Sequence, residues 1–281
     1  MPTSALESDN PLTQEESAQL GRAAVEVARR LLVGRRFLDL YGPLGLGVQA
    51  VPNDDFGAST PAADDVFGEQ EAGAVFGSAR RFRAIPLIYK DFLMHWRDLE
   101  AARGQSLPLD VSAAVSAASL CAQKEDELIF HGDAKLGVEG LMNIAGRQVA
   151  PLIDWTVLGN GLKNAIDAIE RLQRVGQLGP YAMVLSPRLF GMLHRVFEKT
   201  GVLEIQSLRD LTAGRVWPSS QLKGDAALVV STGRQNLDLA MAFDLTIAYL
   251  GPSRLNHPFR VVEAILPRIK RPDSLCTLER S

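Results

Sequence analysis

The clearest hydrophobic pattern of the chain lies within residues 109–143. Small and apolar side chains recur there at about every fourth position: Val111, Ala114, Val115, Ala118, Ala122 and Ile129. Asp110 or Ser112 can cap the start of a helix, and Gly132 can end it. The pattern predicts a long helix, and because alanine has little bulk, its alanine face lets another backbone approach closely. We expect this helix to be the spine of the fold.

A second apolar stripe begins at a capping box near the N-terminus. In the motif TQEE at residues 13–16, the Thr13 hydroxyl and the Glu16 carboxylate can satisfy free amides of a first helical turn. The apolar positions that follow form two neighbouring stripes: Leu20, Ala24, Val25, Val27, Ala28, Leu31 and Leu32. Gly34 is expected to close the helix. So wide an apolar face needs a surface to lie on, either its own domain or, in part, a partner peptide.

Residues 42–77 differ in character from the rest of the chain. They are rich in Gly, Pro, Asp and Ala, and their apolar residues are few: Val48, Val51, Val66, Phe67, Val75 and Phe76 among them. A loop of more than about 15 residues is uncommon in a compact domain and is usually functional or disordered. We expect a flexible lid or an extended arm that is ordered by a neighbouring subunit. The sequence GPLGLG lacks the Lys-Ser/Thr of a phosphate-binding loop.

Residues 152–220 have the pattern of an α/β unit. Helical spacing over 162–172 is followed by a buried run over 181–185, and Ser186 then caps a further helix that starts at Pro187. Residues 198–202 are polar around a glycine, which predicts a loop tip, a place where function tends to lie.

The remaining apolar runs predict β-structure. Pro86 confines the run at 85–89 to the edge of a sheet or an irregular position. Residues 227–242 have two apolar runs around TGRQN and predict a hairpin. Two further strands are expected at 245–250 and 259–269.

The composition limits the class of protein. The chain has 281 residues, of which 46% are hydrophobic and 22% charged, which suits one large core or two smaller cores. A formal net charge of -3 and dispersed basic residues give no reason to expect nucleic-acid binding. Cys121 and Cys276 offer no disulfide framework. The polar first ten residues and the lack of a long apolar run predict a cytoplasmic protein without a signal peptide or membrane span.

Glu125, Asp126, Glu127 and His131 form the one dense group of potential metal ligands. Glu127 and His131 are spaced at i,i+4, whereas di-iron carboxylate bundles use Glu-x-x-His at i,i+3 with glutamates from other helices. A salt-bridged helix end is the simpler interpretation. Cys121 lies on the alanine face, where a thiol is inert, and no Gly-x-Ser-x-Gly elbow is present. We expect no catalytic residue and no metal site.

Several short blocks of sequence follow one another along nearly the whole chain. They are PLT, GRRFLDLYGP, IPLIYKDF, EDELIFHGDAKLGVEGLMN, GPYAMVLSP, ALVVSTG and DLTIAYLG. Together these blocks resemble the shell proteins of family 1 encapsulins, bacterial protein nanocompartments of the linocin type. Three blocks look most like the myxobacterial ferritin-type members: SLCAQKEDELIFHGDA, KTGVLEI and LNHPFRVVEA.

The resemblance implies an α+β fold of the tailed-phage capsid (HK97-like) type, with an N-terminal interior helix. It divides the chain into an N-terminal helix and P-domain entry (1–41), an E-loop (42–80), a P-domain with the spine helix (81–134), an A-domain (135–242) and P-domain return strands (243–281). The E-loop of such a fold pairs with a neighbouring subunit, which favours the arm over the lid for residues 42–77.

The resemblance also implies two functional surfaces. A groove beside the first helix takes the C-terminal targeting peptide of a cargo protein. Its expected residues are Val25, Ala28, Leu32, Arg35, Asp39, Ile247, Tyr249 and Leu250. The tip formed by Lys199, Thr200, Gly201 and Val202 corresponds to a five-fold pore loop.

The function implied by the resemblance is structural. Copies of the chain would assemble into an icosahedral shell around a cargo enzyme, expected to be a ferritin-like iron oxidase, for iron storage and protection against oxidative stress. A phage or prophage major capsid protein is the alternative, although the lack of a strongly basic segment argues against it. Some family members stack a flavin on a Trp that aligns with Trp96, but Lys90 replaces their Arg. Flavin is therefore not favoured, and no cofactor is expected.

Overall fold

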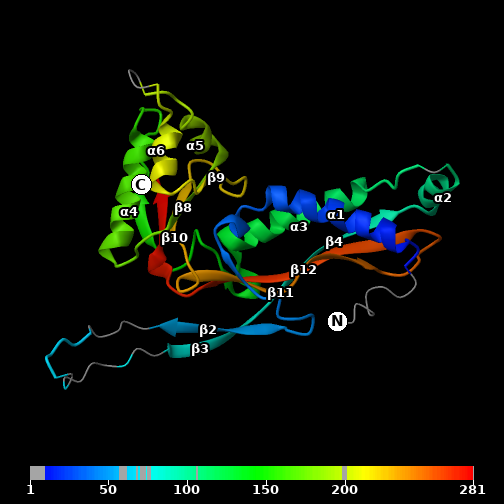
Figure 1. Cartoon of the computed structure of the whole chain (residues 1–281), viewed down its shortest axis with the longest axis horizontal. Coiled ribbons are helices and arrows are strands. Elements are labelled where there is room, and N and C mark those ends of the chain that lie inside the picture. Colours follow the sequence, from blue (N-terminus) through cyan, green and yellow to red (C-terminus); the bar gives the residue numbers. More distant parts are fainter. Residues whose placement is uncertain are drawn as a thin grey trace.

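The computed structural model of the chain describes residues 10–56, 62–67, 69, 74, 77–105, 107–197 and 201–280. Figure 1 shows three parts: a long sheet with helices on one face, an α/β unit at one end of it, and a two-stranded arm. We call the long sheet with its helices the long-sheet part, and this part together with the α/β unit the body.

Four strands form the long sheet. Their order is β1 (Asp39–Tyr41), β11 (Leu237–Tyr249), β12 (His257–Ile269) and β4 (Leu87–Met94). β1 runs parallel to β11, and the other neighbours are antiparallel. β4 lies at an edge, as Pro86 predicts, but it continues to Met94. Short elements complete this part: η1 (Gly34–Arg36), α2 (Trp96–Gln105), β5 (Gly132–Asp133), η2 (Ala134–Leu136) and β6 (Val138–Glu139).

The helix α1 (Gln14–Leu31) begins at the predicted capping box. The Thr13 amide donates to the Glu16 carboxylate over 2.7 Å, and the Glu16 amide donates to Thr13 Oγ1 over 3.2 Å. The helix ends at Leu31, and Gly34 instead opens η1. The prediction that Gly34 closes α1 is therefore wrong, because this glycine is needed for a close contact with α3.

The predicted spine helix is α3 (Ser112–His131). The Asp110 carboxylate accepts the Ser112 amide over 2.9 Å, and Gly132, at φ 68°, ends the helix as predicted. Ala118 is fully buried, and α1 packs along α3 (Figure 1). The small side chains of α3 thus allow the two helices to approach closely above the sheet.

The α/β unit contains a five-stranded sheet and three helices. The strand order is β7 (Gln148–Pro151), β13 (Leu275–Glu279), β10 (Ala227–Ser231), β8 (Tyr181–Leu185) and β9 (Val216–Pro218). The helices are α4 (Asn160–Arg174), α5 (Pro187–Met192) and α6 (Glu204–Leu211), and η3 (Pro272–Ser274) precedes β13. Trp155, Leu193 and Leu208 belong to a core separate from that of the long sheet. The predicted helix-strand-helix order of α4, β8 and α5 is confirmed.

The predicted hairpin over residues 227–242 is wrong. β10 pairs with β8 and β13 in the five-stranded sheet, whereas β11 pairs with β1 and β12 in the long sheet. Residues 232–236 carry the chain from one sheet to the other. The Thr232 amide donates to the Pro180 carbonyl over 2.9 Å, so this link bonds to the segment before β8 rather than across a hairpin.

The strand β13 also departs from the predicted division of the chain. The sequence assigns residues 243–281 to the long-sheet part, but β13 lies between β7 and β10 in the five-stranded sheet. Cys276 and Leu278 are fully buried there in the core of the α/β unit. These side chains complete the core, which explains why the chain crosses back after β12. The other domain boundaries stay predictions.

The arm consists of β2 (Ala50–Phe56) and β3 (Gly77–Ala84), paired antiparallel. Within the described part of the chain, neither strand pairs with another sheet. Val51 at the root is buried, whereas Val66 and Phe67 beyond the strands are 90% and 84% exposed. Apolar side chains this exposed have no core of their own, in agreement with an extended arm rather than a lid.

Candidate cargo and pore surfaces

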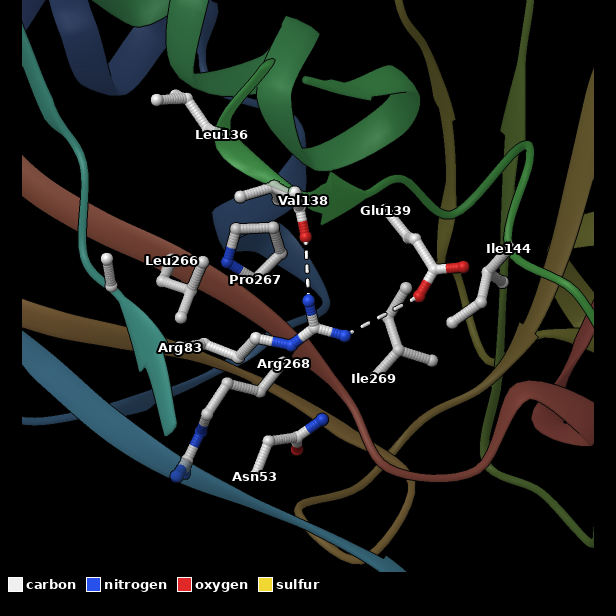
Figure 2. A pocket seen from close by; sticks show the side chains of 12 residues that line it. Asn53, Arg83, Leu136, Val138, Glu139, Ile144, Leu266, Pro267, Arg268 and Ile269 are labelled. Atoms are coloured by element: carbon white, nitrogen blue, oxygen red, sulfur yellow. Dashed lines mark hydrogen bonds and ion pairs between the residues drawn. The ribbon is translucent and has the colours of Figure 1, made fainter. Parts of the chain in front are cut away.

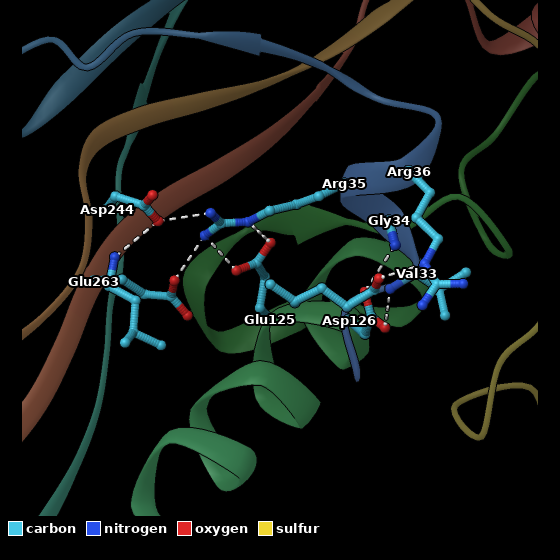
Figure 3. Close-up of polar contacts among 10 residues, drawn as sticks. Val33, Gly34, Arg35, Arg36, Glu125, Asp126, Asp244 and Glu263 are labelled. Atoms are coloured by element: carbon cyan, nitrogen blue, oxygen red, sulfur yellow. Dashed lines mark hydrogen bonds and ion pairs between the residues drawn. The ribbon is translucent and has the colours of Figure 1, made fainter. Parts of the chain in front are cut away.

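An arginine that follows α1 joins the N-terminal segment to the long sheet. Arg35 donates from Nε and Nη2 to both carboxylate oxygens of Glu125 on α3, over 2.7 Å each. Nη2 also donates to Glu263 Oε2 on β12 over 2.8 Å, and Nη1 donates to Asp244 Oδ1 on β11 over 2.6 Å. Figure 3 shows the guanidinium between these three carboxylates. One side chain therefore ties the N-terminal segment to the spine helix and to two strands.

Burial controls the protonation of this network. Desolvation, together with the neighbouring Glu125 carboxylate, raises the pKa of Glu263 to about 9 although Arg35 opposes the shift. Burial also disfavours the charge on Arg35, but the hydrogen bond and the charge of Glu125 outweigh it and raise the pKa of the guanidinium. Near neutral pH, Glu263 is therefore protonated, and the network avoids burying a second carboxylate charge beside Glu125.

The residue next to Glu125 fixes the backbone at the same junction. Asp126 accepts hydrogen bonds from the amides of Val33 and Gly34, over 2.9 Å each. A Cβ atom at Gly34 would lie 2.5 Å from Ile129 Cδ1, so this close approach to α3 needs a glycine. Burial raises the pKa of Asp126 to about 6 in spite of its two hydrogen bonds. Figure 3 places these contacts beside the Arg35 network.

Glu125 and Asp126 thus bond to neighbouring elements, as predicted, whereas Glu127 pairs within α3. Glu127 pairs with Lys124 at 3.2 Å, and His131 Nε2 lies 2.8 Å from the Gln221 carbonyl oxygen. Glu127 and His131 are engaged by different partners and do not form a shared ligand pair. Within the described residues, no three His, Cys, Asp or Glu side chains gather in a way that could hold a metal ion.

The residues predicted to bind a cargo peptide differ in accessibility. Ala28 and Leu32, 3% and 4% exposed, pack with Ala122 and Leu245 in the contact between α1 and the long sheet. Arg35 exposes 16% of its side chain and is held by the three carboxylates. These three predicted residues are therefore largely covered by neighbouring elements and do not line an open surface.

The other predicted cargo residues are more accessible. Val25, Ile247 and Tyr249 are half-buried, and Asp39 and Leu250 are exposed. The structure brings α1 beside β11, so that residues far apart in the chain lie on adjacent elements. The assignment of these residues to a peptide groove stays a prediction.

A hollow of about 770 Å³ lies along α1, and the sequence analysis missed it. It is lined by Ala18, Gly21, Arg22, Val25, Glu26, Arg29, Arg30 and Arg36. Of the predicted groove residues, Val25 takes part in it. The signal in the sequence is a seven-residue spacing of three arginines. Arg22 and Arg29 lie on one face of α1, and Arg36 follows in η1. This surface combines an apolar floor with a basic rim.

The predicted pore tip is a narrow loop between α5 and α6. Val196 and Leu203 form an isolated bridge, and the Phe197 amide donates to the Val202 carbonyl over 2.9 Å. Gly201 has φ 70°, a left-handed conformation that favours glycine at this turn. Lys199 and Thr200, the other two predicted pore residues, lie outside the described residues.

The chain matches the Linocin_M18 family, described as encapsulating protein for peroxidase, over residues 4–266. It is 58% identical over 279 residues to the type 1 encapsulin shell protein EncA of Myxococcus xanthus, a match that covers 99% of this chain and 97% of that protein. The chain belongs to the encapsulin shell protein family. The encapsulin resemblance found in the sequence is thereby confirmed.

Two further encapsulin relatives carry additional domains. A diheme-cytochrome-encapsulin shell fusion protein of Kuenenia stuttgartiensis is 42% identical, with 98% of this chain and 75% of that protein covered. A ferritin-like-encapsulin shell fusion protein of Pyrococcus furiosus is 24% identical, with 71% and 54% covered. In both relatives the region similar to this chain is one part of a longer polypeptide.

Solved structures confirm the predicted α+β capsid fold of this encapsulin. The virus-like particle from Pyrococcus furiosus matches with a TM-score of 0.75 at 20% identity, covering 95% of this chain and 99% of that chain. The capsid of Myoviridae phage XM1 matches with a TM-score of 0.64 at 13% identity, covering 89% and 92%. Encapsulin and tailed-phage capsid thus share one architecture.

Other candidate chemistry of the encapsulin chain can now be placed. Desolvation raises the pKa of the buried Cys121 thiol to about 12, in agreement with an unreactive thiol. Trp96, 42% exposed, begins α2, and its amide donates to Asn256 Oδ1 over 3.3 Å. Lys90 is exposed on β4. That no flavin binds here stays a prediction.

Every helix in the described part of the chain is too short or too polar to cross a bilayer.

Proposed function

We propose that this encapsulin chain assembles with copies of itself into a closed icosahedral shell that encloses a cargo enzyme. The observation that carries the proposal is the arm. Its strands leave the body as a pair, and Val66 and Phe67 beyond them are exposed in the single subunit. A second copy would cover these side chains, and two-stranded ribbons are marginal without such support. The relatives that are described as shell proteins support the same conclusion.

The assembly proposal has a direct test. Purified protein would be examined by analytical sedimentation and negative-stain microscopy. We expect closed particles of megadalton mass, whereas a stable monomer or small oligomer would contradict the proposal. A Phe67→Asp variant should reduce particle yield, because a buried carboxylate at an interface is costly. The matched control is Leu178→Asp, which places the same change on an exposed apolar residue of the body.

The cargo is proposed to be a ferritin-like iron oxidase, and the compartment to serve iron storage and protection against oxidative stress in the cytoplasm. The support is that one relative joins a ferritin-like protein to an encapsulin shell within one chain. A cargo made as a separate protein needs a docking surface instead of a fusion. The groove beside α1, near Val25, Asp39 and Tyr249, is proposed to take the C-terminal targeting peptide of that cargo.

Cargo loading can be measured with a reporter. The C-terminal tail of a candidate ferritin-like protein would be fused to a fluorescent protein and co-expressed with the shell. The reporter per particle should fall in Val25→Glu and Asp39→Ala variants, which alter accessible groove residues without emptying the core. Glu15→Ala, an exposed change in the first turn of α1, is the control. Loading that is equal in all four proteins would remove the groove assignment.

The shell is proposed to be non-catalytic and free of nucleic acid. The dispersed basic residues and net charge of -3 support a particle without packaged DNA. Nuclease-resistant nucleic acid inside purified particles would instead favour a phage-type capsid. For catalysis, iron oxidation would be measured on cargo-free shells. A rate abolished by Glu127→Ala and His131→Ala would show that the shell itself is an enzyme.

The loop tip at residues 199–202 is proposed to line a pore at the five-fold axis. The bridge between Val196 and Leu203 supports this assignment, since it closes the base of a narrow loop between α5 and α6. Cargo-loaded particles with Lys199→Glu should take up ferrous iron at a different rate from particles of the native chain. Equal rates would contradict a role of the tip in ion entry.

A further inference from the structure

The arm contacts the body near its root. The Ile85 amide donates to the Gln49 carbonyl over 2.8 Å, and Val51 is packed into the main core. Beyond these contacts, two arginines connect the arm to the body. Arg268 lies in the body and donates a hydrogen bond to the arm. Arg83 lies in the arm and donates a hydrogen bond to the body.

Arg268 is fixed by the body before it meets the arm. Its side chain is 8% exposed and forms two hydrogen bonds of 2.7 Å with the Asp238 carboxylate across β11 and β12. Its guanidinium carbon lies 4.1 Å from the centre of the Tyr41 ring. From this position Nη1 donates to the Pro52 carbonyl of β2 over 3.0 Å. A paired and stacked arginine is a rigid donor, so it sets the position of β2.

Arg83 holds the other strand of the arm. Nη1 donates to the Gly137 carbonyl over 2.8 Å, and Nη2 lies 3.9 Å from Glu139 Oε2, as Figure 2 shows. Gly137 has φ 64°, and this turn between η2 and β6 presents its carbonyl toward β3. The turn is itself attached to the end of α3 through β5. Arg83 therefore connects β3 to the spine helix.

A cavity of about 40 Å³ lies between arm and body beside the two arginines (Figure 2). Its lining is mixed: apolar side chains such as Leu136 and Ile269 share it with Asn53, Arg83 and Arg268. Atoms at a cavity wall have fewer packing partners, so packing constrains the angle of the arm less there. The hydrogen bonds of the two arginines add a directional constraint, one from the body and one from the arm.

A small change of this angle has a large effect at the far end of the arm. The 8 residues of β3 span about 26 Å at a rise of about 3.3 Å each. A rotation of about 10° at the root displaces the far end by about 5 Å, which is close to the spacing of neighbouring strands. The angle of the arm thus determines which residues of a second copy it can meet.

We propose that Arg83 and Arg268 are positioning residues that fix the angle between arm and body and thereby restrict the shell to one curvature. The inference rests on the proposed assembly into a shell and names the residues that control its geometry. Loss of either contact lets the arm adopt several angles, and particles of more than one size result.

The test compares size distributions of particles made from the full chain, measured by cryo-electron microscopy. Arg83→Met keeps the bulk of the side chain but removes its donors. The fraction of particles outside the main size class should rise about fivefold, the population change given by the loss of one hydrogen bond. Arg80→Met is the matched control, because Arg80 lies on the same strand but pairs with Asp54 within the arm.

The outcomes are distinct. An Arg83→Met size distribution equal to that of the native chain overturns the proposal, and so does an equal change in Arg80→Met. Loss of closed particles without any particles of other sizes also overturns it, since Arg83 would then be needed for assembly itself and not for its curvature. If Arg83→Met lowers the Tm, the size distribution of Arg268→Lys particles is measured instead. Lys keeps the positive charge beside Asp238 but lacks the rigid, forked donor group of Arg. A broader size distribution for Arg268→Lys supports the proposal, and an unchanged one overturns it. A native chain that forms no closed particles contradicts the assembly proposal instead.

Discussion

The α/β unit and the arm of this encapsulin differ in how completely one chain packs them. Every residue of β8 and β10 is buried, and the α/β unit has its own core. The arm has paired strands, but Val66 and Phe67 beyond them remain exposed. The difference shows which parts of a shell subunit are finished by folding and which require assembly. Substitutions in the body should therefore change the stability of the subunit, and substitutions in the arm should not.

The largest effect is expected at the Arg35 network of the body. Arg35→Met should lower the free energy of unfolding by about 3–5 kcal/mol, because it leaves Glu125 and Glu263 buried without their common partner. Thermal or urea unfolding of the purified protein measures the loss. Arg36→Met is the control: Arg36 lies in the same short helix with a side chain that donates to main-chain carbonyls of residues 30 and 32, so the change should cost about 1 kcal/mol.

Two further substitutions, one in each region, compare the α/β unit with the arm directly. Leu208→Ala empties a fully buried position of the α/β unit and should cost about 2–5 kcal/mol of subunit stability. Phe67→Ala removes a larger side chain from the arm, yet it should change subunit stability by about 0.5 kcal/mol or less. The same Phe67→Ala protein should give fewer particles. Equal unfolding midpoints for the two variants would contradict the division into a self-sufficient unit and a dependent arm.

The pH dependence of stability should come from the body. Glu263 has a folded-state pKa of about 9 against an ordinary value of 4.5, so the folded protein binds a proton that the unfolded chain releases between these values. Stability should therefore fall as pH rises through this window. Glu263→Gln, which mimics the protonated acid and cannot release a proton, should flatten the fall across this window. Tm values of both proteins measured across the window test this, and parallel curves would contradict it.

The smallest effect is expected at the ion pair inside the arm. Arg80 and Asp54 expose 63% and 29% of their side chains, and their two hydrogen bonds are 2.7 and 2.8 Å long. The Arg80 hydrogen bond lowers the pKa of Asp54, so any contribution is lost as pH falls. Arg80→Ala should leave the Tm of the subunit unchanged within error. A measurable loss would show that the arm adds to the stability of the single subunit.

Local signals in the sequence predicted the helices well. The capping box at Thr13, the alanine face of α3 and the stop at Gly132 each act within a few residues, so short-range pattern is enough to place them. The link between β10 and β11 could not be predicted from such short-range patterns. Two apolar runs around a Gly-containing turn look like a hairpin locally, but which sheet each run joins depends on long-range partners such as β13 and β12.

The candidate site was less predictable for the same reason. The acidic cluster of α3 was visible in the sequence, and its role in bonding neighbouring elements was inferred. The partners of Arg35, however, lie 90, 209 and 228 residues away in the chain. No spacing rule links such positions, so Arg35 was assigned to an open groove although three carboxylates enclose it.

The position of β13 has a consequence for protein synthesis. The five-stranded sheet places residues 275–279 between β7 and β10, which are made much earlier. Until residue 279 has left the ribosome, β7 has no partner strand and the sheet is divided. The arm, at residues 50–84, emerges long before this point. A growing chain therefore carries the arm, an early interaction element, before the α/β unit that completes the body can form.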